Sequence, residues 1–140
     1  MITRLRHLAK VNPSTPAFSR LDDDSEVTFL PMENIWPGPR LNLSEIRSKS
    51  AVESGYTRFQ DGDILIPKIT PTFEAGRAVL IKGLRGGLGA GTTELHVLRP
   101  GERLDPRFLL HVINTQGYSN NTVTVWDSLY RYCDIIAINE

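Results

Sequence analysis

The sequence predicts a mixed α/β fold: a strand-rich single domain with a twisted mixed sheet and one well-defined helix near residues 105–116. Three observations lead to this prediction. The chain has 140 residues, the usual size of one domain. Short apolar or alternating segments recur along it, separated by Gly and Pro. A single long segment repeats apolar residues at helical spacing.

Short strands are predicted for the first third of the chain. Pro and Gly bound them, because the residue before proline is kept out of the helical region and proline cannot donate to a sheet ladder. We expect strands that end at Asn12, run over Val27–Leu30 and lie near Glu45–Ser48. One short helical turn is expected near Ala51–Ser54, before Gly55 stops it.

An antiparallel pair of strands is predicted for the middle of the chain. Asp61-Gly62 indicates a turn, and both Asp61 and Asp63 are interpreted as turn residues. The strand "DILIPKI" follows, and its consecutive apolar residues 64–66 indicate burial on both faces. It faces a second strand, Arg77–Gly83, across "TPTFEA".

The last third contains the predicted helix. The glycine-rich "GGLGAG" is interpreted as a flexible connection to a half-exposed strand, "TTELHVLRP". In "LDPRFLLHVINTQGY", Asp105 is a good N-cap, Pro106 fits the first helical position and Gly117 ends the helix. Two strand-like segments, "NNTVTVWDS" and "YCDIIAINE", make up the tail. We therefore divide the chain into a domain of residues 1–117 and a C-terminal segment of residues 118–140.

Charge is balanced over the whole chain but not along it. There are 16 basic and 16 acidic residues, so composition alone does not indicate a nucleic-acid binder. Between Ile66 and Arg99, however, five basic side chains stand against two acidic ones. This distribution is compatible with a locally basic face and equally with a solvated mixture of charges.

Several kinds of chemistry have no support in the sequence. The three His residues lack metal-binding spacing, and Cys133, the single cysteine, has no base placed beside it. The stretch "GLRGGLGAGTTE" lacks the Lys of a phosphate-binding loop, and no helix opens after it. No apolar run of about 18 residues and no secretion signal is present. We expect a cytoplasmic protein with no metal, no cofactor and no membrane association.

Three blocks of the chain carry a resemblance to a known family. They are "YTRFQDGDILIPKITPTFEAGRAVLI", "GGLGAGTTELHVLRP" and "LDPRFLLHVI". In this order and spacing they resemble the target recognition domain of specificity subunits from type I restriction-modification enzymes, over roughly Arg6 to Gly117. The chain looks like a single-domain or truncated form. The resemblance implies a reader of double-stranded DNA that does no chemistry and directs a partner methyltransferase subunit, a restriction subunit in the full complex, and in one version a second specificity polypeptide.

The resemblance also implies which residues contact DNA. Lys68 and Arg77 would neutralise phosphates, while Thr70 and Thr72 would donate to phosphates or base edges. The other implied contacts are the rim cation Arg85, the backbone amides of Gly89 and Gly91, the hydroxyls of Thr92 and Thr93, and Arg40 in a base-reading loop from Trp36 to Asn42. The alternative interpretation is an ordinary hairpin and a flexible connection that only shape the fold.

The tail departs from the family pattern. The stretch "SNNTVTVWDSLYRYCDIIAINE" has neither the expected basic cluster nor the start of a spacer helix. A second hypothesis therefore stays open, in which the chain is a degenerate or truncated specificity protein. Such a protein would act as a protein-interaction or assembly module without DNA binding.

Overall fold

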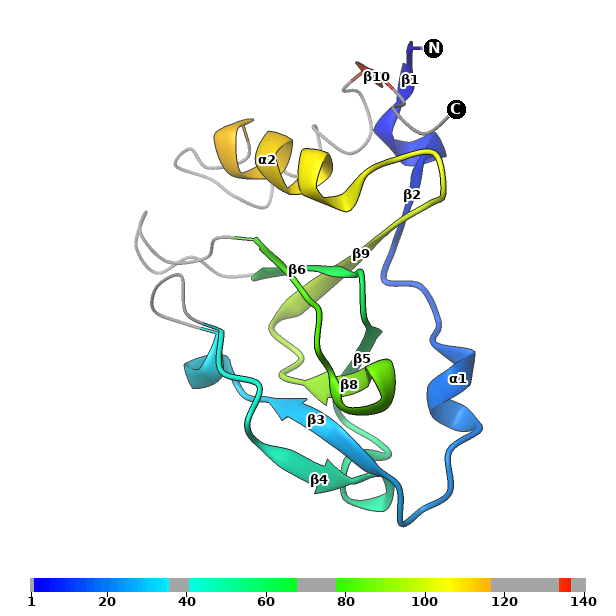
Figure 1. Ribbon diagram of the computed structural model, residues 1–140, viewed down its shortest axis with the longest axis vertical. Coiled ribbons are helices and arrows are strands. Elements are labelled where there is room, and N and C mark those ends of the chain that lie inside the picture. Colours follow the sequence, from blue (N-terminus) through cyan, green and yellow to red (C-terminus); the bar gives the residue numbers. More distant parts are fainter. Residues whose placement is uncertain (1, 36–40, 68–77, 117–133, 137–140) are drawn as a thin grey trace.

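The computed structural model describes residues 2–35, 41–67, 78–116 and 134–136 of the chain. In these residues the strands form two four-stranded sheets and one two-stranded sheet (Figure 1). A strand-rich mixed α/β fold is therefore confirmed, with the strands divided between two main sheets. The two-stranded sheet joins β1 (Ile2–Arg4) to β10 (Asp134–Ile136) in antiparallel register, so part of the C-terminal segment pairs with the first residues.

The first four-stranded sheet has the order β4-β3-β8-β5. Its strands are β3 (Glu26–Leu30), β4 (Ile46–Ser48), β5 (Thr57–Gln60) and β8 (Leu88–Gly91). The β3–β8 pair is parallel and the other two pairs are antiparallel, which makes this a mixed sheet as predicted. Strands β3 and β4 lie where the sequence predicts them. Strand β5 was not predicted, and β8 occupies the stretch interpreted as a flexible connection, so that interpretation is wrong.

The second four-stranded sheet has the order β2-β9-β6-β7, with all neighbours antiparallel. Its strands are β2 (Ala9–Val11), β9 (Leu95–Pro100), β6 (Ile64–Pro67) and β7 (Val79–Leu80). The predicted pairing of the two middle strands is confirmed, with Leu65 opposite Val79. Strand β9 begins later than expected, and Leu98 is buried as well as Leu95 and Val97.

Helix α2 (Pro106–Gln116) confirms the predicted helix. The Asp105 carboxylate accepts the N–H of Arg107 at 2.8 Å, and this backbone hydrogen bond holds the pKa of Asp105 below its usual value. The other helical elements are short: α1 (Pro16–Ser19) and the 3₁₀ turns η1 (Leu5–His7), η2 (Met32–Asn34), η3 (Lys49–Val52) and η4 (Arg85–Gly87). The turn expected near Ala51–Ser54 is η3, which begins two residues earlier.

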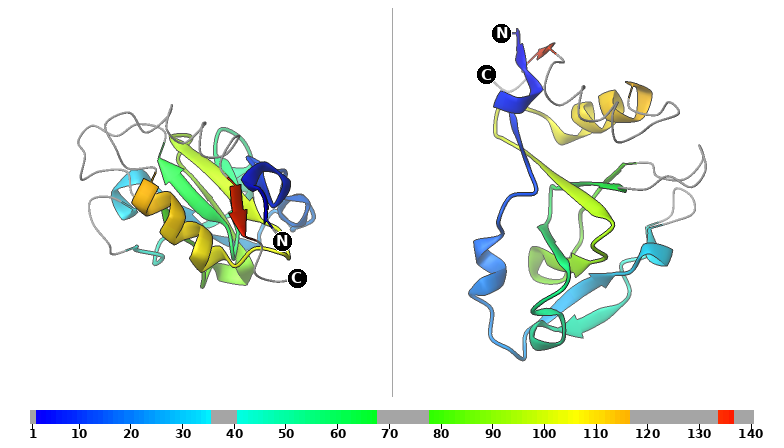
Figure 2. Two further views of the ribbon diagram at one scale, coloured as in Figure 1. Left: turned by 90° about the horizontal axis from the view of Figure 1, so that it is seen from above. Right: turned by 180° about the vertical axis from the view of Figure 1, so that it is seen from behind.

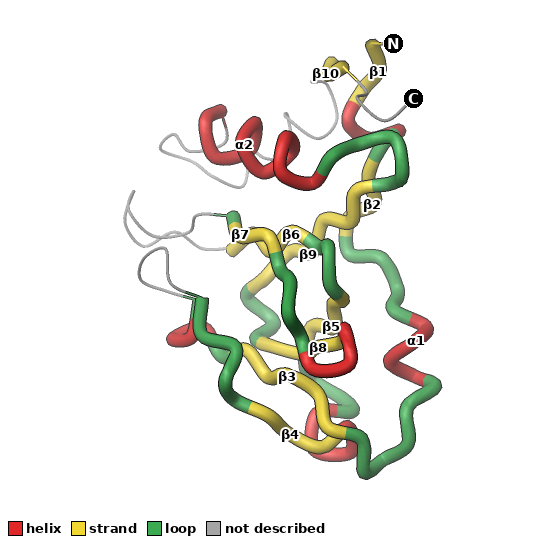
Figure 3. Tube along the Cα trace, in the orientation of Figure 1, coloured by secondary structure: helices red, strands yellow, loops and turns green. Residues whose placement is uncertain are grey.

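The elements stack in layers, each separated from the next by an apolar cluster (Figures 1 and 3). Alternation along β6 shows the arrangement: Ile64 and Ile66 face α2 through one cluster, whereas Leu65 faces the other sheet through the next. A third cluster lies between that sheet and the segment that contains α1, centred on Phe18. Burial of β6 on both faces, predicted from residues 64–66, is confirmed.

A buried ion pair lies where the two sheets are joined. The turn after β5 brings Asp63, which is fully buried, onto Arg99 of β9. Arg99 Nε and Nη2 donate to the two carboxylate oxygens at 2.8 Å each, and Gln60 donates its N–H to Oδ2 at 2.9 Å. The interpretation of Asp61 and Asp63 as turn residues is therefore incomplete, because Asp63 is also an acidic partner in the interior.

We expect Asp63→Ala to lower the free energy of unfolding by about 3–5 kcal/mol, since it leaves the largely buried Arg99 charge without its carboxylate. Urea denaturation followed by circular dichroism measures this. The matched control is Asp24→Ala at an exposed position, which should change stability by no more than about 0.5 kcal/mol. Equal effects of the two substitutions would contradict a structural role for the ion pair.

Candidate nucleic-acid interface

Two segments that carry predicted DNA contacts have well-defined bases in the structure. Asn42 donates its backbone N–H to Asn34 O at 2.9 Å, which closes the base of segment 36–40. The antiparallel pairing of β6 with β7 closes the base of segment 68–77. Five of the predicted contacts, Arg40, Lys68, Thr70, Thr72 and Arg77, lie outside the described residues.

Both loop bases, that is, the residues that flank the two segments, rest on the same apolar cluster. Ile35 and Leu41, next to the first segment, belong to one cluster with Leu65 and Val79 of the β6–β7 pair. In Figures 1 and 2 the end of β6, the start of β7 and η2 lie along one side of the molecule, whereas α1 lies along the other. The scaffold thus fixes two loop bases on one side, which we call the loop side.

Thr92 and Thr93 follow β8. They lie at the same end of the first sheet as η2, because η2 follows β3 and β3 runs parallel to β8. Thr92 donates its backbone N–H to Leu30 O at 3.1 Å, and its hydroxyl accepts the N–H of Glu94 at 3.1 Å. The side chain of Thr93 is exposed. Of the two predicted hydroxyl donors, Thr93 therefore has the more accessible side chain, whereas the Thr92 hydroxyl already shapes the turn.

Arg85 lies in η4, at the opposite end of β8. Its side chain is 56% exposed, and Nη2 donates to Glu26 Oε1 at 3.1 Å. Its backbone N–H donates to Thr28 Oγ1 at 2.8 Å, which ties η4 to β3. An exposed pair of this kind contributes about 1 kcal/mol or less, so the guanidinium can exchange Glu26 for another anion at little cost.

Gly89 and Gly91 occupy buried positions in β8, not a loop. A Cβ at Gly91 would lie 2.5 Å from Leu30 O, and one at Gly89 would lie 2.6 Å from Phe59 Cε2. The neighbouring strands approach β8 too closely for any side chain at these two positions. The prediction that they form part of an open glycine-rich loop is wrong, and the structure gives them a packing role.

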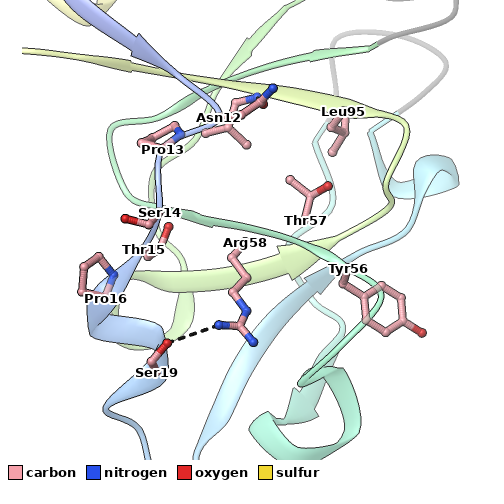
Figure 4. Close-up of a pocket in the computed structure, with 11 residues that line it drawn as sticks. Asn12, Pro13, Ser14, Thr15, Pro16, Ser19, Tyr56, Thr57, Arg58 and Leu95 are labelled. Carbon is pink, nitrogen blue, oxygen red and sulfur yellow. Dashed lines mark hydrogen bonds between the residues drawn. The ribbon is translucent and has the colours of Figure 1, made fainter.

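A hollow of about 360 Å³ lies between the chain that leads into α1 and strand β5 (Figure 4). Its lining includes Ser14, Thr15, Thr57 and Leu95. Arg58 reaches into it, but Nη1 already donates to Ser19 Oγ at 3.3 Å. None of the predicted contact residues that the structure describes lines this hollow.

Metal-binding clusters and membrane-spanning helices are both absent from the described part of the chain. There the structure contains no group of three or more His, Cys, Asp or Glu side chains that could hold a metal ion. Among the same residues, no helix has the length and apolar character needed to cross a membrane.

Two specificity subunits of type I restriction enzymes are similar to this chain in sequence. The type I restriction enzyme EcoEI specificity subunit of Escherichia coli is 42% identical over 118 residues, and the EcoAI specificity subunit of the same organism is 41% identical over 112 residues. These matches cover 81% and 77% of this chain. No protein family model matches the sequence.

The chain is thus a homologue of type I restriction enzyme specificity subunits, and it spans about a fifth of their length, 19% and 18% respectively. A crystal structure of the HsdS subunit from Thermoanaerobacter tengcongensis aligns over 88% of this chain and 30% of that one. Its TM-score is 0.45 at 15% sequence identity.

We expect Gly91→Ala to destabilise the fold by about 1–3 kcal/mol or more, because the added methyl group meets the backbone oxygen of Leu30. Thermal unfolding of the purified variant measures the change. An exposed substitution, Ser54→Ala, serves as the control and should be nearly neutral. A Gly91→Ala variant of unchanged stability would speak against the packing role.

Proposed function

We propose that this chain recognises a sequence in double-stranded DNA as the target recognition domain, or part, of a type I restriction-modification specificity subunit. The observation that carries the proposal is the 42% identity to a specificity subunit over 118 residues. The chain itself would be non-catalytic and need no cofactor. It would direct a partner methyltransferase subunit and, in the full complex, a restriction subunit in the cytoplasm.

Recognition would take place on the loop side. Lys68 and Arg77 would neutralise phosphates, and Thr70, Thr72 and Thr93 would donate hydrogen bonds to phosphates or base edges. Arg40 would bind guanine, whose O6 and N7 accept two parallel hydrogen bonds from a guanidinium. The described scaffold supports these contacts, because the residues that flank both segments belong to one apolar cluster, and fixed points of attachment lower the conformational entropy lost on binding.

The proposed domain of residues 1–117 would carry this surface. The C-terminal segment, residues 118–140, would complete the module at its β10–β1 pair. A second specificity polypeptide is a further candidate partner of the chain.

We expect Lys68→Gln and Arg77→Gln each to weaken binding to every duplex alike, because phosphate contacts carry no sequence information. Each should reduce the slope of log affinity against log salt by about 0.9. Fluorescence anisotropy at several salt concentrations measures both quantities. The control is Arg20→Gln, at an exposed position just after α1, which lies away from the loop side.

Sequence recognition itself is tested by enrichment from a random duplex library, with the chain alone and with its methyltransferase subunit. We expect a recovered sequence motif in at least one of the two experiments. Binding without a motif would leave only a basic surface. Co-purification with the methyltransferase in the absence of DNA binding would instead establish the assembly-module hypothesis.

A further inference from the structure

Five of the described basic side chains are paired with acids. Arg47 pairs with Glu45, Lys49 with Glu53, Arg85 with Glu26, Arg99 with Asp63 and Arg107 with Asp105. Lys82 differs from them. It is exposed, and within the described part of the chain its side chain forms no ion pair or hydrogen bond. Its charge is therefore available to an external anion without the loss of an internal partner.

The backbone around Lys82 is held in place on both sides. Ile81 donates to Asp63 O at 2.9 Å and accepts from Gly62 N at 2.8 Å. Leu84 donates its N–H to the Asp61 carboxylate at 3.0 Å. Gly83, between them, adopts a positive φ of 84°, which a residue with a side chain rarely does. The side chain of Lys82 is therefore exposed on a backbone that its neighbours hold in place.

Lys82 also lies near one of the two loop bases, that of segment 36–40. It follows β7 by two residues, at the end of the β6–β7 pair opposite segment 68–77, because Ile81 is hydrogen-bonded to Gly62 and Asp63. The neighbouring Gly83 approaches Leu43, because a Cβ built there would lie 3.8 Å from Leu43 Cδ1. Leu43 follows Asn42, whose N–H closes the base of segment 36–40. One exposed cation thus lies close to the described end of segment 36–40.

We propose that Lys82 is a further phosphate-binding residue, which extends the DNA-contact surface from the loops onto the edge of the second sheet. The inference rests on the proposed function. A flexible ammonium on a fixed backbone suits a phosphate, which needs a positive charge within reach but no fixed hydrogen-bond geometry. This residue was counted in the basic region of the sequence, but only the structure distinguishes it from the paired cations.

The chain offers a matched control in Lys10. Lys10 is also exposed and, among the described residues, forms no ion pair. It lies on β2, the strand at the opposite edge of the same sheet. Lys10→Gln and Lys82→Gln therefore make the same change of charge at the same kind of surface. They differ in their distance from the loop side.

The experiment measures the affinity of the full chain for a fixed duplex by anisotropy, from 50 to 300 mM salt. For Lys82→Gln we expect a salt slope smaller by about 0.9 and an affinity about 5–10-fold lower at 0.1 M salt. Lys82→Arg should restore both, because a phosphate contact needs the charge. Lys10→Gln should behave as the unchanged chain. Circular dichroism melting of each variant checks that the fold is retained.

Two outcomes would overturn the inference while DNA recognition stands: an unchanged slope for Lys82→Gln, or equal losses for Lys82→Gln and Lys10→Gln. In the first case Lys82 makes no contact, and in the second the effect is that of net charge alone. Failure of the unchanged chain to bind any duplex would instead overturn the proposed function, and this inference with it.

Discussion

The ion pair between Asp63 and Arg99 joins parts of the molecule that no local interaction could hold together. Strand β5 belongs to one four-stranded sheet and β6 to the other, and Asp63 lies in the short turn that connects them. Arg99 belongs to β9, and it also donates to Ser14 O at 2.9 Å and to Thr15 Oγ1 at 3.1 Å. One guanidinium therefore fixes the junction of the sheets and the chain that leads into α1.

Burying this pair is costly, because both charges leave water. The geometry offsets much of the cost: the two hydrogen bonds are parallel and charge-assisted, and Gln60 satisfies a further lone pair of the carboxylate. The same turn also organises the segment from Ile81 to Gly87, through hydrogen bonds from Gly62 N to Ile81 O and from Asp61 N to Gly87 O. The position of the β7 edge thus depends on a three-residue turn.

The pairing of charges has a consequence for the proposed recognition of DNA. A chain with a net charge of +0 attracts DNA weakly overall, so affinity must come from a few cations with no acidic partner. Five of the described basic side chains are held by acids. Weak general attraction with a few well-placed contacts favours specificity, since the sequence-independent phosphate contribution stays small while base contacts discriminate.

Features that depend on neighbours in the sequence were predictable. The cap at Asp105, Pro106 at the first position and the apolar spacing of α2 act within one or two turns. The turn at Gly62 and the burial of residues 64–66 follow in the same way from local chemistry and composition. The loop-side contacts Lys68, Thr70, Thr72, Arg77 and Arg40 remain predictions. The structure places Arg85 on the surface, as the sequence predicts.

The sequence by itself determined the strand-rich class, the one long helix and the double burial of β6, because propensity, capping and periodicity are short-range. Only the tertiary structure decided that "LGAG" is a central strand: Gly89 and Gly91 are needed there because Phe59 and Leu30, distant in sequence, approach its backbone. It likewise decided which cations are paired. Asp63 and Arg99 are 36 residues apart, and no local pattern indicates that folding brings them together.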